Sequence, residues 1–184
     1  MNDAAILDFL QLVEPLKKTL RTAWDHDGRQ ETTAEHSWRL ALMTACFLPQ
    51  FPEVDGQKAL VMALIHDLAE SVTGDISAAS LPDKKMKDQE ENQVFEQITN
   101  ALPLEMQKKF REIFAEYQTN SSPEAHLIKA LDKAETILQH NQGKNPENFD
   151  YEFNLNYGKK FFADSRLQPL RELLDEQTKE NLES

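Results

Sequence analysis

The chain has 184 residues, of which 40% are hydrophobic and 28% are charged, an ordinary balance for a globular protein. This length fits one domain and is sufficient to bury a core. The net charge of −12 argues against a protein that binds DNA or RNA along the phosphate backbone, because such binding needs a basic face. A small phosphorylated ligand is still compatible with this charge, because a divalent ion and one or two basic residues can hold one phosphate.

Glycine is scarce, with 5 residues, and long stretches lack turn residues, so the sequence predicts an all-α fold. Residues 1–5 contain no basic segment of the kind that opens a secretory signal peptide. The longest apolar run is far shorter than a membrane span. The single cysteine, Cys46, excludes an intrachain disulfide and is expected to lie in the core. We therefore expect a cytoplasmic protein that does not cross a membrane.

The N-terminal third is predicted to form three helices. Apolar spacing predicts the first over about 4–20, with Pro15 as a kink or an end, and a loop over 21–28. Thr32 and Glu35 form a capping-box pattern, so the second helix is expected to begin there and to reach about residue 48. The third is predicted over about 57–72 and stops before Gly74.

The remaining elements are also predicted to be helical. The fourth helix, about 83–101, is mostly polar, and we interpret its run 84–87, followed by Glu90-Glu91, as a solvated face. The fifth helix follows Pro103. The sixth begins at Ser122-Pro123, a cap followed by an N1 proline, and reaches about residue 139. A polar loop over 143–150 precedes two further helices, at about 153–163 and 167–181.

The most informative segment is the apolar run 59–65, which leads directly into His66-Asp67. A carboxylate in a helix that is apolar nearly all round costs several kcal/mol unless it is paired or bound to a cation. Glu70 lies one turn further on, so the three side chains can face one region. The nearest basic residue of this helix is more than two turns away, so a bound metal ion is the simplest explanation. Two further ionisable residues that could bind a metal ion, His36 and Asp132, occur elsewhere in the chain.

Two imidazoles and two carboxylates form a usual ligand set for a divalent ion of the first transition row. Such an ion polarises an electrophile and supplies a water of lowered pKa as a nucleophile. The chain contains no GxSxG, Walker, GxGxxG or CxxC motif. These observations favour hydrolytic metal chemistry.

The order His36…His66-Asp67…Asp132 resembles the H…HD…D signature of the HD-domain metal-dependent phosphohydrolases. Five blocks resemble the branch of small HD proteins that includes the 5'-deoxynucleotidases, and they cover roughly residues 5–140. These blocks are Arg21-Thr22-Ala23-Trp24, Ala34-Glu35-His36-Ser37, His66-Asp67-Leu68-Ala69-Glu70, Gly74-Asp75-Ile76 and Leu131-Asp132-Lys133-Ala134-Glu135. The resemblance implies a single all-α HD domain over 1–184, with a motif-bearing core at about 5–140 and C-terminal helices at about 150–184.

The resemblance also implies a role for individual residues. The metal ligands would be His36, His66, Asp67 and Asp132. The cofactor would be a divalent metal ion, and such a ligand set accepts Mn, Co, Fe, Ni, Zn or Mg.

The implied catalytic carboxylates are Glu70 and Asp75, which would orient or deprotonate water and protonate the leaving 5'-oxygen. Arg21 would lie near the phosphate and Trp24 near the sugar. Trp24 lies three positions after Arg21, whereas in the best-known members the tryptophan follows the arginine directly. Each residue also has a structural alternative: a surface ion pair for Glu70 or Arg21, a turn for Asp75 and a core position for Trp24. Glu135 fits either a structural role or a hydrogen bond to a metal ligand.

The resemblance implies a metal-dependent phosphomonoesterase that releases phosphate from (deoxy)nucleoside 5'-monophosphates. The expected partner is a small-molecule nucleotide, not a nucleic acid polymer or a membrane, and a homodimer is possible. One alternative is another HD-type phosphohydrolase, such as a phosphodiesterase or a guanosine tetraphosphate hydrolase. The other is a nucleotide-binding regulatory module with little turnover.

Overall fold

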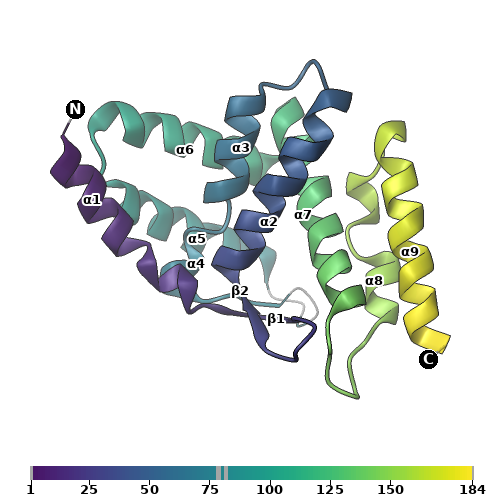
Figure 1. Ribbon diagram of the computed structural model, residues 1–184. Helices are drawn as coiled ribbons and strands as arrows, with labels where there is room; N and C mark the ends of the chain where they lie inside the picture. Colours follow the sequence, from purple (N-terminus) through teal and green to yellow (C-terminus); the bar gives the residue numbers. More distant parts are fainter. Residues whose placement is uncertain (1, 78–79, 81–82, 184) are drawn as a thin grey trace.

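The computed structural model describes residues 2–77, 80 and 83–183. Helices dominate this part of the chain, which confirms the expected all-α fold. The long helix α7 (Pro123–Gln142) lies at the centre and packs against α2 (Thr33–Phe47), α3 (Gly56–Ile65) and α9 (Gln168–Glu183) (Figure 1). Side chains on most sides of α7 are buried, so this helix can present polar groups to a site inside the bundle.

Two peripheral groups of helices flank this centre (Figure 1). On one side, α5 (Lys84–Thr99) and α6 (Leu104–Thr119) pack together, with the rings of Phe95 and Phe114 stacked at 3.9 Å. On the other side, the short α8 (Glu152–Asn156) packs against α9. The predicted starts of α5, α6 and α7 are confirmed within one residue, because each follows a cap or a proline that the sequence displays.

The N-terminal prediction is wrong after residue 12. Helix α1 spans Asp3–Leu12, and Pro15 opens the 3-10 turn η1 (Glu14–Lys17). A proline disfavours the helical conformation at the residue before it, which explains the early end. The predicted loop is instead a hairpin of β1 (Leu20–Trp24) and β2 (Gln30–Thr32), which pair antiparallel.

The start of α2 is confirmed in detail. Thr32 is the N-cap, its hydroxyl accepts a hydrogen bond from the amide of Glu35, and the Glu35 carboxylate accepts one from the amide of Thr32. This capping box fixes the first turn, in which His36 is fully buried.

The predicted third helix is broken at the most informative residues. Helix α3 ends at Ile65, His66 is its C-cap, and a separate turn, α4, spans Glu70–Thr73. Between them the backbone hydrogen bonds close over three residues, from the amide of Leu68 to the carbonyl of Ile65 and from the amide of Glu70 to the carbonyl of Asp67. Asp67 and Glu70 therefore do not lie on one regular helical face.

Three smaller predictions also need correction or comment. The predicted helix over about 153–163 is only α8, followed by the 3-10 turn η4 (Lys159–Phe161), because Gly158 adopts a left-handed conformation with φ of 68°. Cys46, expected in the core, is exposed. Every helix within the described ranges is too short or too polar to span a membrane.

Candidate metal centre

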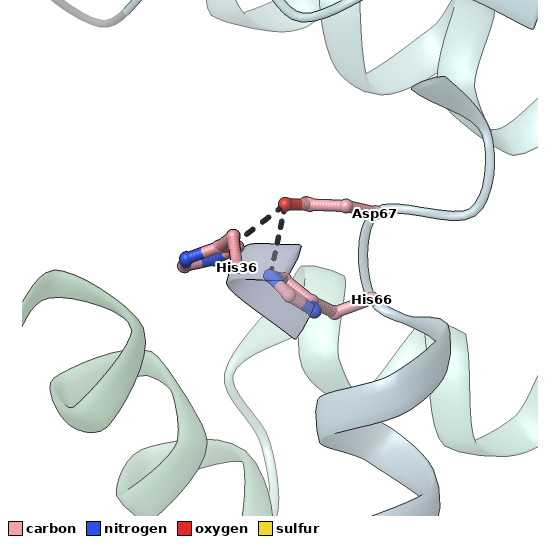
Figure 2. A group of neighbouring side chains, drawn as sticks. All are labelled: His36, His66 and Asp67. Atoms are coloured by element: carbon pink, nitrogen blue, oxygen red, sulfur yellow. Dashed lines mark ion pairs between the residues drawn. The ribbon is translucent and has the colours of Figure 1, made fainter. Parts of the chain in front are cut away.

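Two imidazole rings lie together between α2 and the end of α3. The ring centroids of His36 and His66 are 5.4 Å apart (Figure 2). Nδ1 of His66 lies 2.9 Å from the carbonyl oxygen of Ala63 and donates to it, and Nδ1 of His36 contacts the carboxylate of Glu135. Both Nε2 atoms are buried and have no hydrogen-bond partner among the described residues. A buried ring nitrogen that makes no hydrogen bond is costly, so these two atoms fit the ligands of a metal ion.

Two carboxylates face these orphaned nitrogens. Oδ2 of Asp67 lies 3.0 Å from Nε2 of His66 and 3.8 Å from Nε2 of His36 (Figure 2). Oδ1 of Asp132, on α7, lies 3.3 Å from Nε2 of His36. The structure thus brings His36, His66 and Asp67 within ligand distance of one another and places Asp132 beside His36. Two nitrogens and two carboxylate oxygens form a donor set that suits a first-row divalent ion.

The protonation states of the cluster are compatible with metal binding. Burial and Arg21 oppose a charge on His36, yet its contacts with Glu135 and Asp132 raise its pKa to about 9. Burial opposes the charge of Asp67, but the neighbouring His66 and His36 hold the pKa of Asp67 well below its usual range. Without a metal ion, the negative charge of the carboxylates is therefore balanced by a proton on the imidazole of His36. A divalent ion would replace that proton, since metal binding requires a neutral imidazole.

Glu135 supports His36 from the side away from the cluster. Its carboxylate contacts Nδ1 of His36 and accepts a hydrogen bond from Nε of Arg39, 2.7 Å from Oε1. Arg21 lies 3.6 Å from the same carboxylate and 3.0 Å from that of Glu31. Burial raises the pKa of Glu135, but the contacts with His36, Arg21 and Arg39 lower it overall to about 2. Glu135 therefore contacts a proposed metal ligand, His36, and this contact fixes the orientation of the imidazole ring.

Asp132 also has partners beyond the cluster. Its Oδ2 accepts hydrogen bonds from the hydroxyl of Tyr117, at 2.9 Å, and from Nζ of Lys133, at 2.7 Å. Asp132 therefore has a basic partner, Lys133, on its own helix. This contact is not expected from residue spacing, because adjacent residues of a helix do not usually face each other.

The proposed catalytic carboxylates are both placed near Asp67. Glu70 is buried, and its Oε2 accepts a hydrogen bond from the hydroxyl of Thr33 at 3.1 Å. Burial and the negative charges of Asp67 and Asp75 raise the pKa of Glu70 to about 9. Burial also raises the pKa of Asp75, with Asp67 adding to the effect and Arg21 opposing it. Glu70 is therefore a candidate proton donor near neutral pH.

Arg21 and Trp24 are placed differently along β1. The guanidinium of Arg21 donates to Glu31 at 3.0 Å and to the hydroxyl of Thr136 at 3.1 Å, so it lies beside α7 one turn from Asp132. Trp24 is half-buried, and its ring packs edge-on against Phe149 with centroids 6.0 Å apart. Arg21 thus belongs to the charged network of the cluster, whereas Trp24 lies at its periphery.

Lys87 lies near the site, although its place in the polar run 84–87 predicts a solvated face. Its ammonium lies 3.8 Å from Glu70 and 3.4 Å from Glu91. The carboxylates of Glu91, Glu70, Asp67 and Asp75 raise the pKa of Lys87 against the opposing effect of burial. The i,i+4 spacing of Lys87 and Glu91 was visible in the sequence, but such pairs are common on exposed helices.

The chain is also similar in sequence to known proteins. Residues 13–169 match the family model described as HD domain. The chain is 35% identical over 149 residues to the 5'-deoxynucleotidase HDDC2 of Mus musculus, covering 80% of this chain and 74% of that protein. It is 35% identical over 141 residues to the 5'-deoxynucleotidase hdd1 of Schizosaccharomyces pombe, covering 73% and 70%.

A solved structure supports the fold. A predicted metal-dependent phosphohydrolase from Magnetospirillum magnetotacticum superposes with a TM-score of 0.80 over 98% of this chain and 95% of its own. Its sequence is 24% identical, so the likeness concerns the fold alone.

Proposed function

Because this chain belongs to the HD-domain family, we propose that it is a metal-dependent phosphomonoesterase that hydrolyses (deoxy)nucleoside 5'-monophosphates to nucleoside and phosphate. One observation carries the proposal: two buried Nε2 atoms, of His36 and His66, make no hydrogen bond within the described part of the chain and face the carboxylates of Asp67 and Asp132. The substrate class is supported by the relatives that are named 5'-deoxynucleotidases.

In this proposal His36, His66, Asp67 and Asp132 hold one divalent ion. Mn, Co, Fe, Ni, Zn and Mg all remain candidates for a site of two imidazoles and two carboxylates. When bound, such an ion polarises the phosphoryl group and lowers the pKa of water. The protein orients the two rings by contacts at Nδ1, which the carbonyl of Ala63 makes with His66 and the carboxylate of Glu135 makes with His36. The Nε2 atom of each ring is thereby kept for the ion.

Glu70 and Asp75 are the proposed acid–base groups. The hydroxyl of Thr33 holds Oε2 of Glu70, and Oε1 lies 3.8 Å from Nζ of Lys87, too far for a hydrogen bond, so Oε1 can still meet water or substrate. Burial beside Asp67 favours the protonated form of Glu70, and a protonated carboxyl can donate to the leaving 5'-oxygen. Asp75 would orient the attacking water.

Arg21 is proposed to bind the phosphate and Trp24 to lie against the sugar. The carbonyl of Trp24 accepts a hydrogen bond from Gln139, seven residues after Asp132 on α7. Seven residues span about 10 Å along a helix, a distance that a nucleoside can cover from a phosphate at the cluster. The substrate would therefore extend along α7, with its phosphate at the cluster and its nucleoside toward the hairpin.

This orientation predicts different effects for the two residues. Arg21→Ala should lower kcat/KM for every nucleotide alike, because every substrate carries the phosphate. Trp24→Ala should narrow the preference for deoxyribo over ribo substrates, because a bulky ring can exclude a 2'-hydroxyl by sterics. The measurement is kcat/KM for matched deoxy- and ribonucleoside monophosphates in the wild type and both variants. An unchanged ratio in Trp24→Ala would assign that ring to packing against Phe149.

The proposed partner is a small-molecule nucleotide, and the net charge of −12 argues against a nucleic acid polymer. We also propose that the protein works in the cytoplasm, away from membranes, and as a homodimer. Exposed apolar side chains such as Leu173 and Leu182 of α9 are available for such an interface. Sedimentation of the purified protein would test the dimer.

The function is tested by a phosphate-release screen over nucleotides crossed with the six divalent metals. We expect release from 5'-monophosphates, with deoxy forms favoured. Turnover of cyclic dinucleotides or of guanosine tetraphosphate instead would indicate another HD-type phosphohydrolase. Tight nucleotide binding without phosphate release would indicate a regulatory module.

A further inference from the structure

The two carboxylate oxygens of Asp132 have different surroundings. Oδ2 is engaged by the hydroxyl of Tyr117 and by Nζ of Lys133, at 2.9 and 2.7 Å. Oδ1 instead lies 3.3 Å from the orphaned Nε2 of His36. The two donors on Oδ2 thus fix the carboxylate in an orientation that turns its other oxygen toward the cluster.

The C-terminal part of the chain fixes Lys133 in turn. Gly158, which follows α8, lies so close to this side chain that a Cβ added to it would be 2.5 Å from Cγ of Lys133 and 2.7 Å from its Cβ. Only glycine allows such a close approach, and its φ of 68° is also one that glycine adopts most easily. The ammonium of Lys133 lies 5.2 Å from the ring centroid of Tyr157, within the range of a cation–π contact.

Helix α9 holds this segment in place. The buried guanidinium of Arg171 donates to the carbonyl oxygens of Asn154, Leu155 and Tyr157, at 2.8, 2.9 and 2.6 Å. These bonds satisfy carbonyls at the end of α8 and fix the backbone directly before Gly158. A continuous set of contacts therefore runs from α9 through Gly158 and Lys133 to Asp132.

We propose that Tyr157, Gly158 and Arg171, here called the C-terminal clamp, complete the metal site by holding Lys133 on Oδ2 of Asp132, so that Oδ1 is presented to the ion. The inference rests on the proposed function, in which Asp132 is a metal ligand. The clamp residues act through Lys133 and are positioning residues. Loss of such a partner of a ligand typically lowers metal affinity ~10–100-fold. The clamp also assigns a role to the C-terminal helices, in which the sequence shows no motif.

Two glycine variants test the clamp. Gly158→Ala and Gly28→Ala both introduce a side chain at a positive φ, 68° and 87°, so their backbone strain is similar. At Gly28 the nearest atom to an added Cβ is Cδ of Lys144 at 3.6 Å, an ordinary contact, whereas at Gly158 the added atom displaces Lys133. Affinity for Co²⁺ is measured by competition with a chelator, and the Co²⁺ absorption spectrum reports ligand geometry. We expect Gly158→Ala to lower the affinity ~10–100-fold and to alter the spectrum, and Gly28→Ala to change neither.

Lys133→Met supplies a second variant, which keeps an apolar stem but removes the ammonium. We expect the same loss of affinity, and combining it with Gly158→Ala should add little, because both act through one contact. If Gly158→Ala does not fold, the result for Lys133→Met decides.

The inference is overturned if Lys133→Met binds Co²⁺ as tightly as the wild type, or if Gly28→Ala loses as much affinity as Gly158→Ala. The Co²⁺ affinity of Asp67→Ala distinguishes failure of the clamp from failure of the proposed function. If Asp67→Ala retains Co²⁺, the proposed ligand set itself is wrong. If Asp67→Ala loses Co²⁺ and the clamp variants retain it, only the clamp is wrong.

Discussion

Asp67→Ala is expected to purify without its divalent ion and to lose roughly 10³-fold or more in kcat/KM. The carboxylate lies 3.0 and 3.8 Å from the two Nε2 atoms, so its removal opens the cluster and leaves both imidazoles without their shared anion. A bound ion contributes several kcal/mol of transition-state stabilisation, and about 1.4 kcal/mol corresponds to each factor of ten in rate.

Elemental analysis of the purified proteins and kcat/KM for a deoxynucleoside monophosphate are the two measurements. Asp27→Ala is the matched control, because the side chain of Asp27 is 80% exposed in the hairpin turn. Equal metal content in Asp67→Ala and the wild type would contradict the assignment.

Glu70→Ala is expected to retain the metal and to lose ~10²–10⁴-fold in turnover, the usual contribution of a general acid or base. Burial and the negative charges of Asp67 and Asp75 raise the pKa of Glu70, which favours a role in proton transfer. Its side chain is not among the four proposed ligands, and Thr33 fixes its orientation. The residue is therefore expected to act on the reacting atoms and not on the ion.

Metal content and kcat are compared in the wild type, Glu70→Ala and Glu90→Ala, the last an exposed carboxylate of α5. A Glu70→Ala variant with nearly wild-type turnover would assign Glu70 to a structural role. Loss of metal together with turnover would instead place Glu70 among the groups that retain the ion.

The second helix illustrates what local sequence predicts well. Thr32 and Glu35 are three residues apart, so one capping box both marks the start of α2 and places His36 in its buried first turn. The start of α7 is predicted for a similar reason, from Ser122 and Pro123. These signals depend on neighbours within a single turn, and residue identity alone reveals them.

The segment around His66 shows the limit of such reasoning. Its apolar run predicts a continuous helix to about residue 72, but the chain leaves the regular helix after Ile65 and forms tighter turns up to Glu70. Apolar residues occupy a regular helix and tighter turns equally well, so the periodicity of apolar residues does not distinguish the two conformations. The hairpin after α1 was missed because its pairing depends on the contact of β1 with β2 and α7.

By itself, the sequence determined the helical class, the metal-ligand candidates and the class of chemistry, because buried ionisable groups in an apolar run need a compensating charge or ion wherever they lie. Only the tertiary structure decided which groups supply that compensation. Glu135 reaches His36 across 99 residues, and Lys87 approaches Glu70 from another helix. Gly158 fits against Lys133 from the C-terminal part of the chain. Such contacts follow from the packing of whole helices, whose side-chain partners have no fixed spacing in the chain.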